Sequence, residues 1–262
     1  MFQKSEDDTK HFLRKFWIGN YGRVVTSRIR ILFLFAPLLY SCHATGNNDG
    51  THGNTTESIL ESSLEAIANT VDRDKVKSII AFANCTSPKG KYTTEIHTDS
   101  EGYSYFKQTY TYNPQAFEAK IYHKTQGFQS RDSTQTLSKE AIYTIRSHEF
   151  FNLILDVKQR FHEFSEPELI EVNQQQMYRI AARDELNHFC LLFFDNHSGL
   201  LNEIHLQNPE NEKELLIITF SDWKKVDTLQ LPMHIVISQS EQLYTFDFIK
   251  VQFNSPDFRQ KK

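Results

Sequence analysis

The chain has 262 residues, which is enough for one large domain or two small ones. Its 29 Lys and Arg residues and 33 Asp and Glu residues give a formal net charge of −4, and the basic residues are scattered. Nucleic-acid phosphates require clustered Lys and Arg, so the composition argues against a nucleic-acid partner.

Residues 1–41 are predicted to be a secretory signal. Arg23, Arg28 and Arg30 precede a short apolar run at residues 31–39, and a small residue, Ser41, comes directly before Cys42. The run is too short to span a bilayer, which needs about 20 apolar residues. The sequence Leu-Tyr-Ser-Cys at residues 39–42 resembles a bacterial lipobox, which predicts a lipidated Cys42 as the first mature residue. The alternative is an ordinary cleaved signal with an incidental cysteine.

Residues 1–22 are long and mixed in charge for a signal, which leaves two interpretations. Either the start codon is assigned too early, or the signal peptide has an extended n-region. Removal of residues 1–41 takes away seven Lys and Arg and three Asp and Glu, leaving 22 against 30, a net charge of −8. Cys85 and Cys190 then remain as side-chain thiols that could pair in an oxidising envelope, or stay as two isolated buried thiols.

The body of the chain is predicted to follow a flexible tether at residues 42–55, rich in Gly, Asn and Thr. A helix is predicted over 56–82, with a break near Asp72, because apolar residues recur there at spacings of three and four. Three strands follow, at residues 91–98, 103–112 and 117–124. A polar stretch at 126–136 then separates these strands from a second helix at 138–155, with Ser138 as its N-cap.

The remainder is predicted to be a meander of strands. Residues 176–182, 188–195 and 200–207 are separated by turn residues, and the stretch 214–254 shows three further strands of alternating apolar residues. Residues 221–225 are predicted to break the first of these. Successive strands without a βαβ pattern indicate an α+β fold, with a curved antiparallel sheet as an unclosed half-barrel wrapped on two or three helices. This domain is expected over 56–256, with a C-terminal tail at 257–262.

No catalytic or metal signature has a specific spacing. None of the histidines forms HxH or HExxH, and GxSxG and a glycine-rich phosphate loop are also lacking. We therefore predict no enzymatic activity, no metal and no cofactor. The positive feature is the large number of apolar and aromatic side chains on strands that a few short helices must cover. They form an ordinary core, or they line an apolar hollow of the kind used to bind lipids.

The C-terminal third resembles the bacterial lipoprotein-carrier superfamily. The resemblance rests on the order of Asp195 and Ser198-Gly199-Leu200, then residues 218–223, Leu231-Pro232, residues 244–248, and Val251 to Asn254. It implies an unclosed half-barrel with an apolar cavity for acyl chains, and a lipidated member would most nearly resemble the anchored outer-membrane receptor. The carrier's lid arginine has no identifiable counterpart in this sequence, so the resemblance does not extend to carrier activity itself.

The resulting hypothesis is an envelope lipoprotein, anchored to the outer membrane through Cys42 and facing the periplasm, that binds a lipid or a lipoprotein acyl chain non-covalently. A periplasmic interaction or sensor module with a filled core and an envelope protein partner is the alternative, and a hydrolase is a distant third. The candidate ligand-lining residues are Phe106, Tyr110, Ile121, Phe151, Leu155, Phe193, Ile204, Ile218, Phe220, Ile235, Phe246 and Phe248.

The lipobox assignment makes a direct prediction. Cys42→Ala should leave the precursor uncleaved by the lipoprotein signal peptidase, because the modified thiol is what marks the cleavage site. Mass spectrometry of the mature N-terminus checks this. An unmodified Cys42, or a mature N-terminus at another residue, would contradict the assignment.

Overall fold

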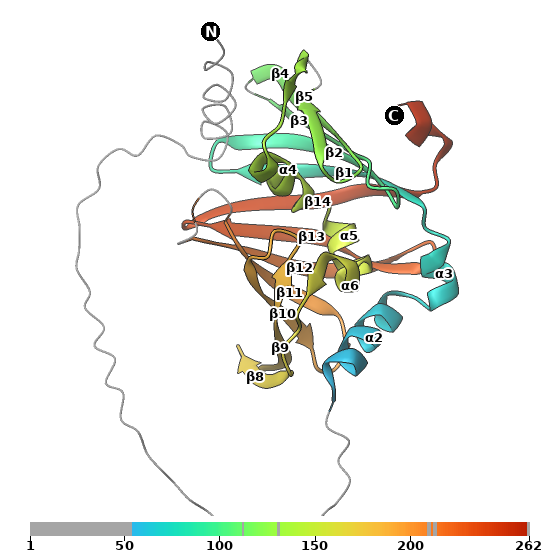
Figure 1. Cartoon of the computed structure of the whole chain (residues 1–262), viewed down its shortest axis with the longest axis vertical. Coiled ribbons are helices and arrows are strands. Elements are labelled where there is room, and N and C mark those ends of the chain that lie inside the picture. Colours follow the sequence, from blue (N-terminus) through green and yellow to red (C-terminus); the bar gives the residue numbers. More distant parts are fainter. Residues whose placement is uncertain (1–53, 112, 130–131, 209–210, 212–213, 261–262) are drawn as a thin grey trace, which may run out of the picture. The chain divides into compact units, whose positions relative to one another are not determined.

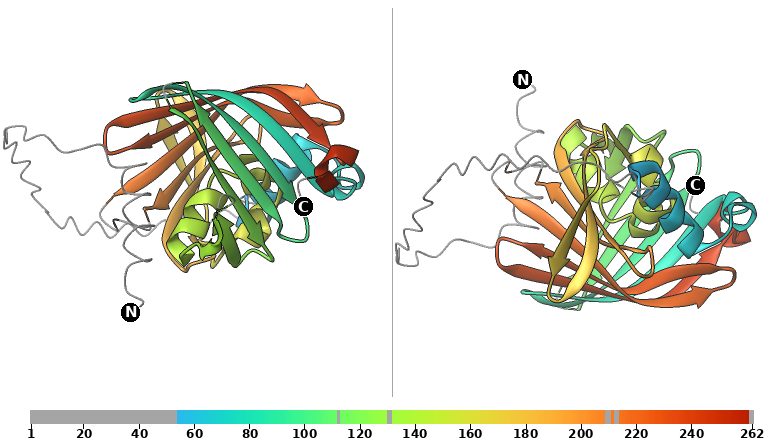
Figure 2. Two further views of the ribbon diagram at one scale, coloured as in Figure 1. Left: turned by 90° about the horizontal axis from the view of Figure 1, so that it is seen from above. Right: turned by 90° about the horizontal axis from the view of Figure 1, so that it is seen from below.

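The computed structural model describes residues 54–111, 113–129, 132–208, 211 and 214–260 (Figure 1). Cys42, the predicted signal and most of the predicted tether lie outside the described residues. Within them, fourteen strands form one sheet that does not close, with its ends at β6 and at β7 and β8. The sheet curves around the helices (Figure 2), which confirms the predicted α+β half-barrel.

The sheet is antiparallel throughout the pairs that the structure describes, and strand β1 pairs with β14 as well as with β2. The beginning and the end of the domain therefore lie side by side at the centre of the sheet, and a hairpin series extends from there to each edge. The strands are β1 Ser78–Ser87, β2 Gly90–Asp99, β3 Ser104–Tyr110, β4 Asn113–Tyr122, β5 Gln126–Gln129, β6 Asp132–Thr136, β7 Phe161–His162, β8 Glu168–Val172, β9 Gln175–Asp184, β10 Phe189–Asp195, β11 Leu201–Gln207, β12 Leu215–Val226, β13 Leu229–Gln239 and β14 Gln242–Phe253.

The helices α4 to α6 lie on the concave side of the sheet (Figure 2). Thr55, Asn69 and Ser138 each begin a helix by accepting a hydrogen bond from a backbone N–H, which confirms Ser138 as a cap. None of the helices in the described part of the chain combines the length and apolarity needed to cross a bilayer. The helices are α2 Thr56–Ile67, α3 Thr70–Asp74, α4 Lys139–Arg146, α5 Phe150–Leu155, α6 Val157–Arg160 and the 3₁₀ helix η1 Pro256–Gln260.

The prediction of a helix over residues 56–82 was wrong beyond Asp74. Residues 78–82 belong to β1, whose two faces are both covered, so Ile79 and Ala81 alternate with Ile80 and Phe82. A strand that is buried on both faces reads as a continuous apolar run, and such a run also satisfies the helical spacing. The second predicted helix is present, but it is interrupted between Arg146 and Phe150.

Two stretches that were predicted to be irregular are strands. Residues 126–136 contain the hairpin β5–β6, which is polar because it lies at the edge of the sheet. The predicted break at 221–225 lies inside β12, where Asp222 has a φ of 53° and the pairing with β13 continues on both sides. The short strands β7 and β8 were not predicted.

The convex face carries its own aromatic cluster. Tyr103 and Tyr105 lie there with Ile80, and Phe258 of η1 packs on them, with its ring centroid 5.7 Å from that of Tyr103. Only 6% of Phe258 is exposed, so part of the segment that was predicted to be a tail covers the sheet.

Candidate functional site

The concave face of the half-barrel is apolar over most of its width. Residues paired directly across neighbouring antiparallel strands point to the same side of a sheet. One row of such residues crosses four strands as Leu192, Ile204, Ile218 and Ile237, and all four are buried. A second row crosses six strands and consists of Phe220, Ile235, Phe246, Cys85, Tyr92 and Tyr110.

Nine of the twelve residues proposed from sequence lie on this concave face, and Phe151 and Leu155 come from α5. The nine are Phe106, Tyr110, Ile121, Ile204, Ile218, Phe220, Ile235, Phe246 and Phe248. Phe193 points to the convex face, where its ring lies 4.7 Å from that of His205. The expectation for Phe193 was wrong because β10 is apolar on both faces, and Leu192 and Phe194 are the residues that point inward.

Aromatic side chains of the α4–α5 segment fill the centre of the concave face. The ring of Phe150 lies 5.0 Å from Phe246, and that of Phe151 lies 4.8 Å from Phe248. His148 lies 5.4 Å from Phe106. These separations are typical of packed aromatic pairs. Protein side chains therefore occupy the centre of the region where the sequence analysis expected a hollow.

His148 is the polar member of this cluster and is 3% exposed. Its Nδ1 hydrogen-bonds the carbonyl oxygen of Thr144 at 2.8 Å, which assigns the proton to Nδ1. Burial lowers the pKa of His148 to about 4, so the neutral imidazole is the form that this interior accepts.

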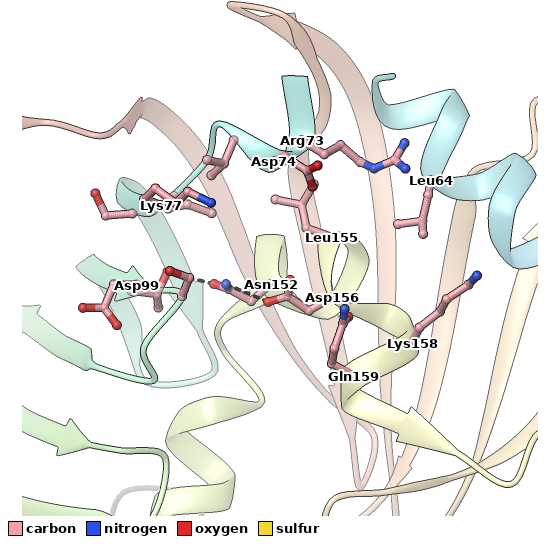
Figure 3. A pocket seen from close by; sticks show the side chains of 15 residues that line it. Leu64, Arg73, Asp74, Lys77, Asp99, Asn152, Leu155, Asp156, Lys158 and Gln159 are labelled. Carbon is pink, nitrogen blue, oxygen red and sulfur yellow. Dashed lines mark hydrogen bonds between the residues drawn. The ribbon is translucent and has the colours of Figure 1, made fainter. Parts of the chain in front are cut away.

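A cleft of about 210 Å³ opens at one end of the half-barrel, between α2–α3 on one side and α5–α6 on the other (Figure 3). Its apolar part is formed by Leu64, Val76, Ile79 and Leu155. Leu64 and Ile79 are also buried core residues, so the cleft reaches the edge of the apolar interior. Leu155 is the one residue of the sequence-predicted lining that borders it. The polar lining residues are Arg73, Asp74, Lys77, Ser78, Thr98, Asp99, Ser100, Asn152, Asp156, Lys158 and Gln159.

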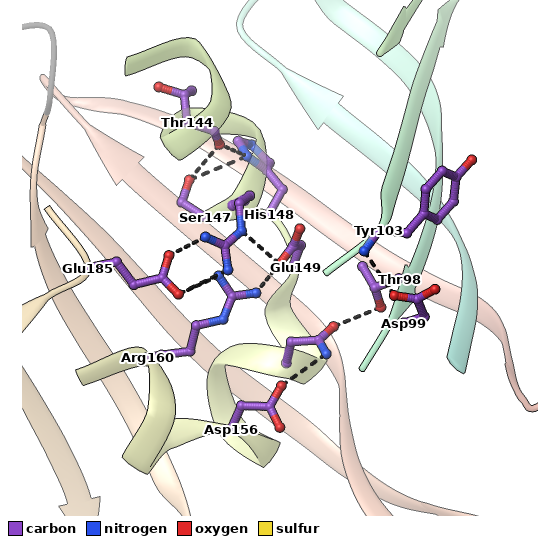
Figure 4. Close-up of polar contacts among 12 residues, drawn as sticks. Thr98, Asp99, Tyr103, Thr144, Ser147, His148, Glu149, Asp156, Arg160 and Glu185 are labelled. Carbon is purple, nitrogen blue, oxygen red and sulfur yellow. Dashed lines mark hydrogen bonds and ion pairs between the residues drawn. The ribbon is translucent and has the colours of Figure 1, made fainter. Parts of the chain in front are cut away.

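A short chain of hydrogen bonds crosses the wall of the cleft from β2 to the end of α5. The Thr98 hydroxyl donates to Asn152 Oδ1 at 2.8 Å, and Asn152 Nδ2 donates to Asp156 Oδ2 at 3.2 Å (Figure 4). Burial raises the pKa of Asp156 above its usual range. Sequence reasoning missed these residues because they form no motif. Their one signal is the i,i+4 spacing of Asn152, near the end of the second predicted helix, and Asp156, one residue beyond it.

Four charged residues hold the α4–α6 segment to the turn between β9 and β10. Arg146 and Arg160 both contact Glu149 and Glu185, with Arg146 Nε 3.6 Å from Glu149 and Arg160 Nη1 3.9 Å from Glu185 (Figure 4). Burial lowers the pKa of Arg160 to about 9. Buried charges of this kind are tolerated only when they are paired, so removal of one member leaves another uncompensated.

Cys85 and Cys190 do not form a disulfide, because both are free and buried. Cys85 lies on β1 and Cys190 on β10, with four strands between them. At about 4.8 Å between neighbouring strands, the two Cα atoms are far beyond the roughly 7 Å that a disulfide permits. Burial raises the pKa of each thiol to about 12, so both are unreactive at neutral pH.

The described residues contain no group of three or more His, Cys, Asp or Glu side chains that could hold a metal ion. Four histidines do pair with carboxylates, and the pairs are His97 with Glu95, His188 with Asp184, His205 with Glu203 and His234 with Asp247. None of these histidines lines the cleft.

An unclosed antiparallel half-barrel with helices against its concave face is the architecture of the bacterial lipoprotein-carrier superfamily, and this chain has that LolA-like fold. It is similar to a LolA superfamily protein from Nitrosomonas europaea, with 13% identity, coverage of 78% of this chain and 96% of that one, and a TM-score of 0.56. An outer membrane lipoprotein-sorting protein domain from Vibrio parahaemolyticus matches at 11% identity, 77% and 98% coverage and a TM-score of 0.49. No family model matches the sequence, and neither does any curated protein.

The buried histidine predicts an acid-dependent loss of stability. The folded state holds a His148 pKa of about 4, whereas the unfolded value is near 6.5, so the unfolded chain binds the proton first. The contribution of neutral His148 to the free energy of unfolding is complete above about pH 6.5. It decreases as the pH falls toward 4, by about 3 kcal/mol in total. Urea unfolding at pH 7 and pH 4 measures it.

His148→Phe is the comparison, because it keeps an aromatic ring and removes the titration. The variant should lose about 3 kcal/mol less than the wild type between the two pH values. Equal losses in both proteins would show that His148 is not buried as a neutral group.

Proposed function

We propose that this chain is a lipid-anchored protein of the bacterial envelope that binds the acyl chain of a lipid or a lipoprotein non-covalently. Cys42 would carry the anchor, at the periplasmic face of the outer membrane. The acyl chain would lie between the α4–α6 segment and the concave face of the sheet. One observation carries this proposal: the cleft is lined by Leu155, which is half-buried, together with the buried core residues Leu64 and Ile79, so it lies where the apolar interior meets solvent.

The volume of the cleft limits what it can hold alone. Pockets for drug-sized ligands measure about 300–1,000 Å³, whereas this cleft measures about 210 Å³. It accommodates a head group or the end of a chain. A longer acyl chain needs the space that Phe150 and Phe151 occupy, so binding requires the α4–α6 segment to move away from β14.

The short helices of the α4–α6 segment support such a movement. Helices α4, α5 and α6 have eight, six and four residues, and helices of this length have little stability of their own. Their position depends on the packing of their rings, on the ion pairs of Arg146 and Arg160 with Glu185, and on the hydrogen bond from Thr98 to Asn152. An acyl chain would replace the ring contacts with contacts of the same apolar kind, each buried CH₂ contributing about 0.8 kcal/mol.

The second candidate is a protein-interaction module with a filled core. The packed rings of Phe150 and Phe246 favour it, and so do exposed apolar side chains on the convex face. Phe189, Leu215 and Leu243 are 52%, 47% and 57% exposed there. A hydrolase remains the distant third candidate, because the residues that line the cleft include no histidine to act as a base.

The test is uptake of a fluorescent fatty acid by the wild type and by Leu155→Trp. The larger side chain should fill the half-buried cleft and reduce uptake at least tenfold. Little stability should be lost, because the ring enters open volume rather than a packed core. Leu243→Trp is the matched control, since Leu243 is exposed at the opposite end of the sheet and its replacement should leave uptake unchanged.

Absence of uptake by the wild type would reject acyl binding in favour of the interaction module. Equal uptake by Leu155→Trp and the wild type would show that the cleft is not the entry.

A further inference from the structure

The cleft carries opposite charges on two of its walls. Lys77 lies on the wall between α3 and β1, and Asp156 lies across the cleft at the end of α5 (Figure 3). The Lys77 ammonium has no ion-pair or hydrogen-bond partner in the described part of the chain. Asp156 accepts a hydrogen bond from Asn152 and makes no ion pair with any described residue.

The other cations of the cleft are already paired. Lys158 binds Glu57 and Glu61 of α2, with its Nζ 2.6 Å from Glu57. Arg73 lies 4.0 Å from Glu65 and hydrogen-bonds the hydroxyl of Thr70. These neighbours on α2 and α3 neutralise both residues, so Lys77 is the cation that remains for an incoming anion.

The carboxylates that line the cleft also differ in whether they already have partners. Asp99 Oδ1 accepts hydrogen bonds from the backbone N–H groups of Glu101 and Tyr103, at 2.9 Å each, which hold it in its own turn. Asp74 ends α3 on the same wall as Lys77 and is exposed at the rim, so Asp156 is the carboxylate that remains for a ligand on the wall across the cleft. The groups left for a ligand are the Lys77 ammonium on one wall and the Asp156 carboxylate on the other, beside an apolar floor.

Resting on the acyl-binding function proposed above, we propose that the cleft is the head-group site for a zwitterionic phospholipid whose head group carries a primary ammonium and a phosphate. The phosphate contacts Lys77, the ammonium contacts Asp156, and the glycerol end faces Leu155. A primary ammonium offers three N–H donors to carboxylates. A quaternary ammonium offers none, and a glycerol head group carries no positive charge.

Burial of Asp156 strengthens this contact. A carboxylate that is largely removed from water, and whose pKa burial raises, gains more from a nearby cation than an exposed carboxylate does. The size also fits, because about 210 Å³ accommodates a head group but not two acyl chains.

The experiment compares short-chain phospholipids that stay monomeric in solution, by calorimetry on the mature protein. Dihexanoyl phosphatidylethanolamine should bind at least about tenfold more tightly than dihexanoyl phosphatidylglycerol and phosphatidylcholine, the difference expected for one charge-assisted contact. Asp156→Asn keeps the shape and the contact with Asn152, and should abolish this preference. Lys77→Gln should weaken all three lipids to a similar extent, because each carries the phosphate.

Glu241→Gln is the matched control. Glu241 is exposed in the turn between β13 and β14, at the end of the sheet opposite the cleft, and its replacement should change nothing. Equal affinity of the wild type for the three lipids, or an unchanged preference in Asp156→Asn, would overturn the head-group assignment while acyl binding stands. Failure of all three lipids and of the fluorescent fatty acid to bind would instead overturn the proposed function.

Discussion

The packing of α5 against the inner surface of β14 is the interaction on which the rest of the structure depends. Phe150 and Phe151 meet Phe246 and Phe248 at the centre of an open sheet, and the described part of the chain contains no second sheet to close the fold. A curved sheet with an uncovered apolar face would be unstable in water, because burial of such side chains contributes about 1.5–3 kcal/mol each. The short helices thus replace the missing wall of a barrel.

In the proposed function, the same arrangement lets an acyl chain displace the helical segment. The rings contact the sheet through apolar surface alone, and such contacts have little directional specificity. The directional contacts are the ion pairs among Arg146, Arg160, Glu149 and Glu185, and the hydrogen bond that Thr98 of β2 donates to Asn152 of α5. Under the proposed function, these polar contacts define the position to which the segment returns, and the apolar face of the sheet contacts either the rings or an acyl chain.

Much of the fold could be predicted from sequence wherever one face of an element is polar. The alternation in β11, with Ile204 and Leu206 inward, defined both the strand and its buried face. Prediction failed where both faces are covered. In β1, Ile80 and Phe82 are covered by Phe258, which is remote in sequence. Both faces of the strand are therefore apolar, and the alternation of apolar and polar residues that marks a strand is absent. For the same reason the prediction assigned Phe193 to the wrong face of β10, because nothing in a run of apolar residues distinguishes Phe193 from Phe194.

The cleft was beyond sequence reasoning for a different reason. Its polar groups come from α3, the start of β1 and the end of α5, and Lys77 and Asp156 are brought together only by the folding of the whole half-barrel. Each is an ordinary charged residue in a loop or at a helix end, with no spacing that marks it. Of the predicted lining, Leu155 alone identified this end of the interior.

The position of a bound acyl chain tests the central claim most directly. A fatty acid with a photoactivatable group at its methyl end can be bound, irradiated and mapped by mass spectrometry to single residues. Strand β14 provides the internal comparison, since Phe246 and Phe248 point inward while Thr245 and Asp247 point outward. The account predicts adducts on Phe246, Phe248 and α5. Adducts confined to the convex face, on Thr245 or Leu243, would contradict it.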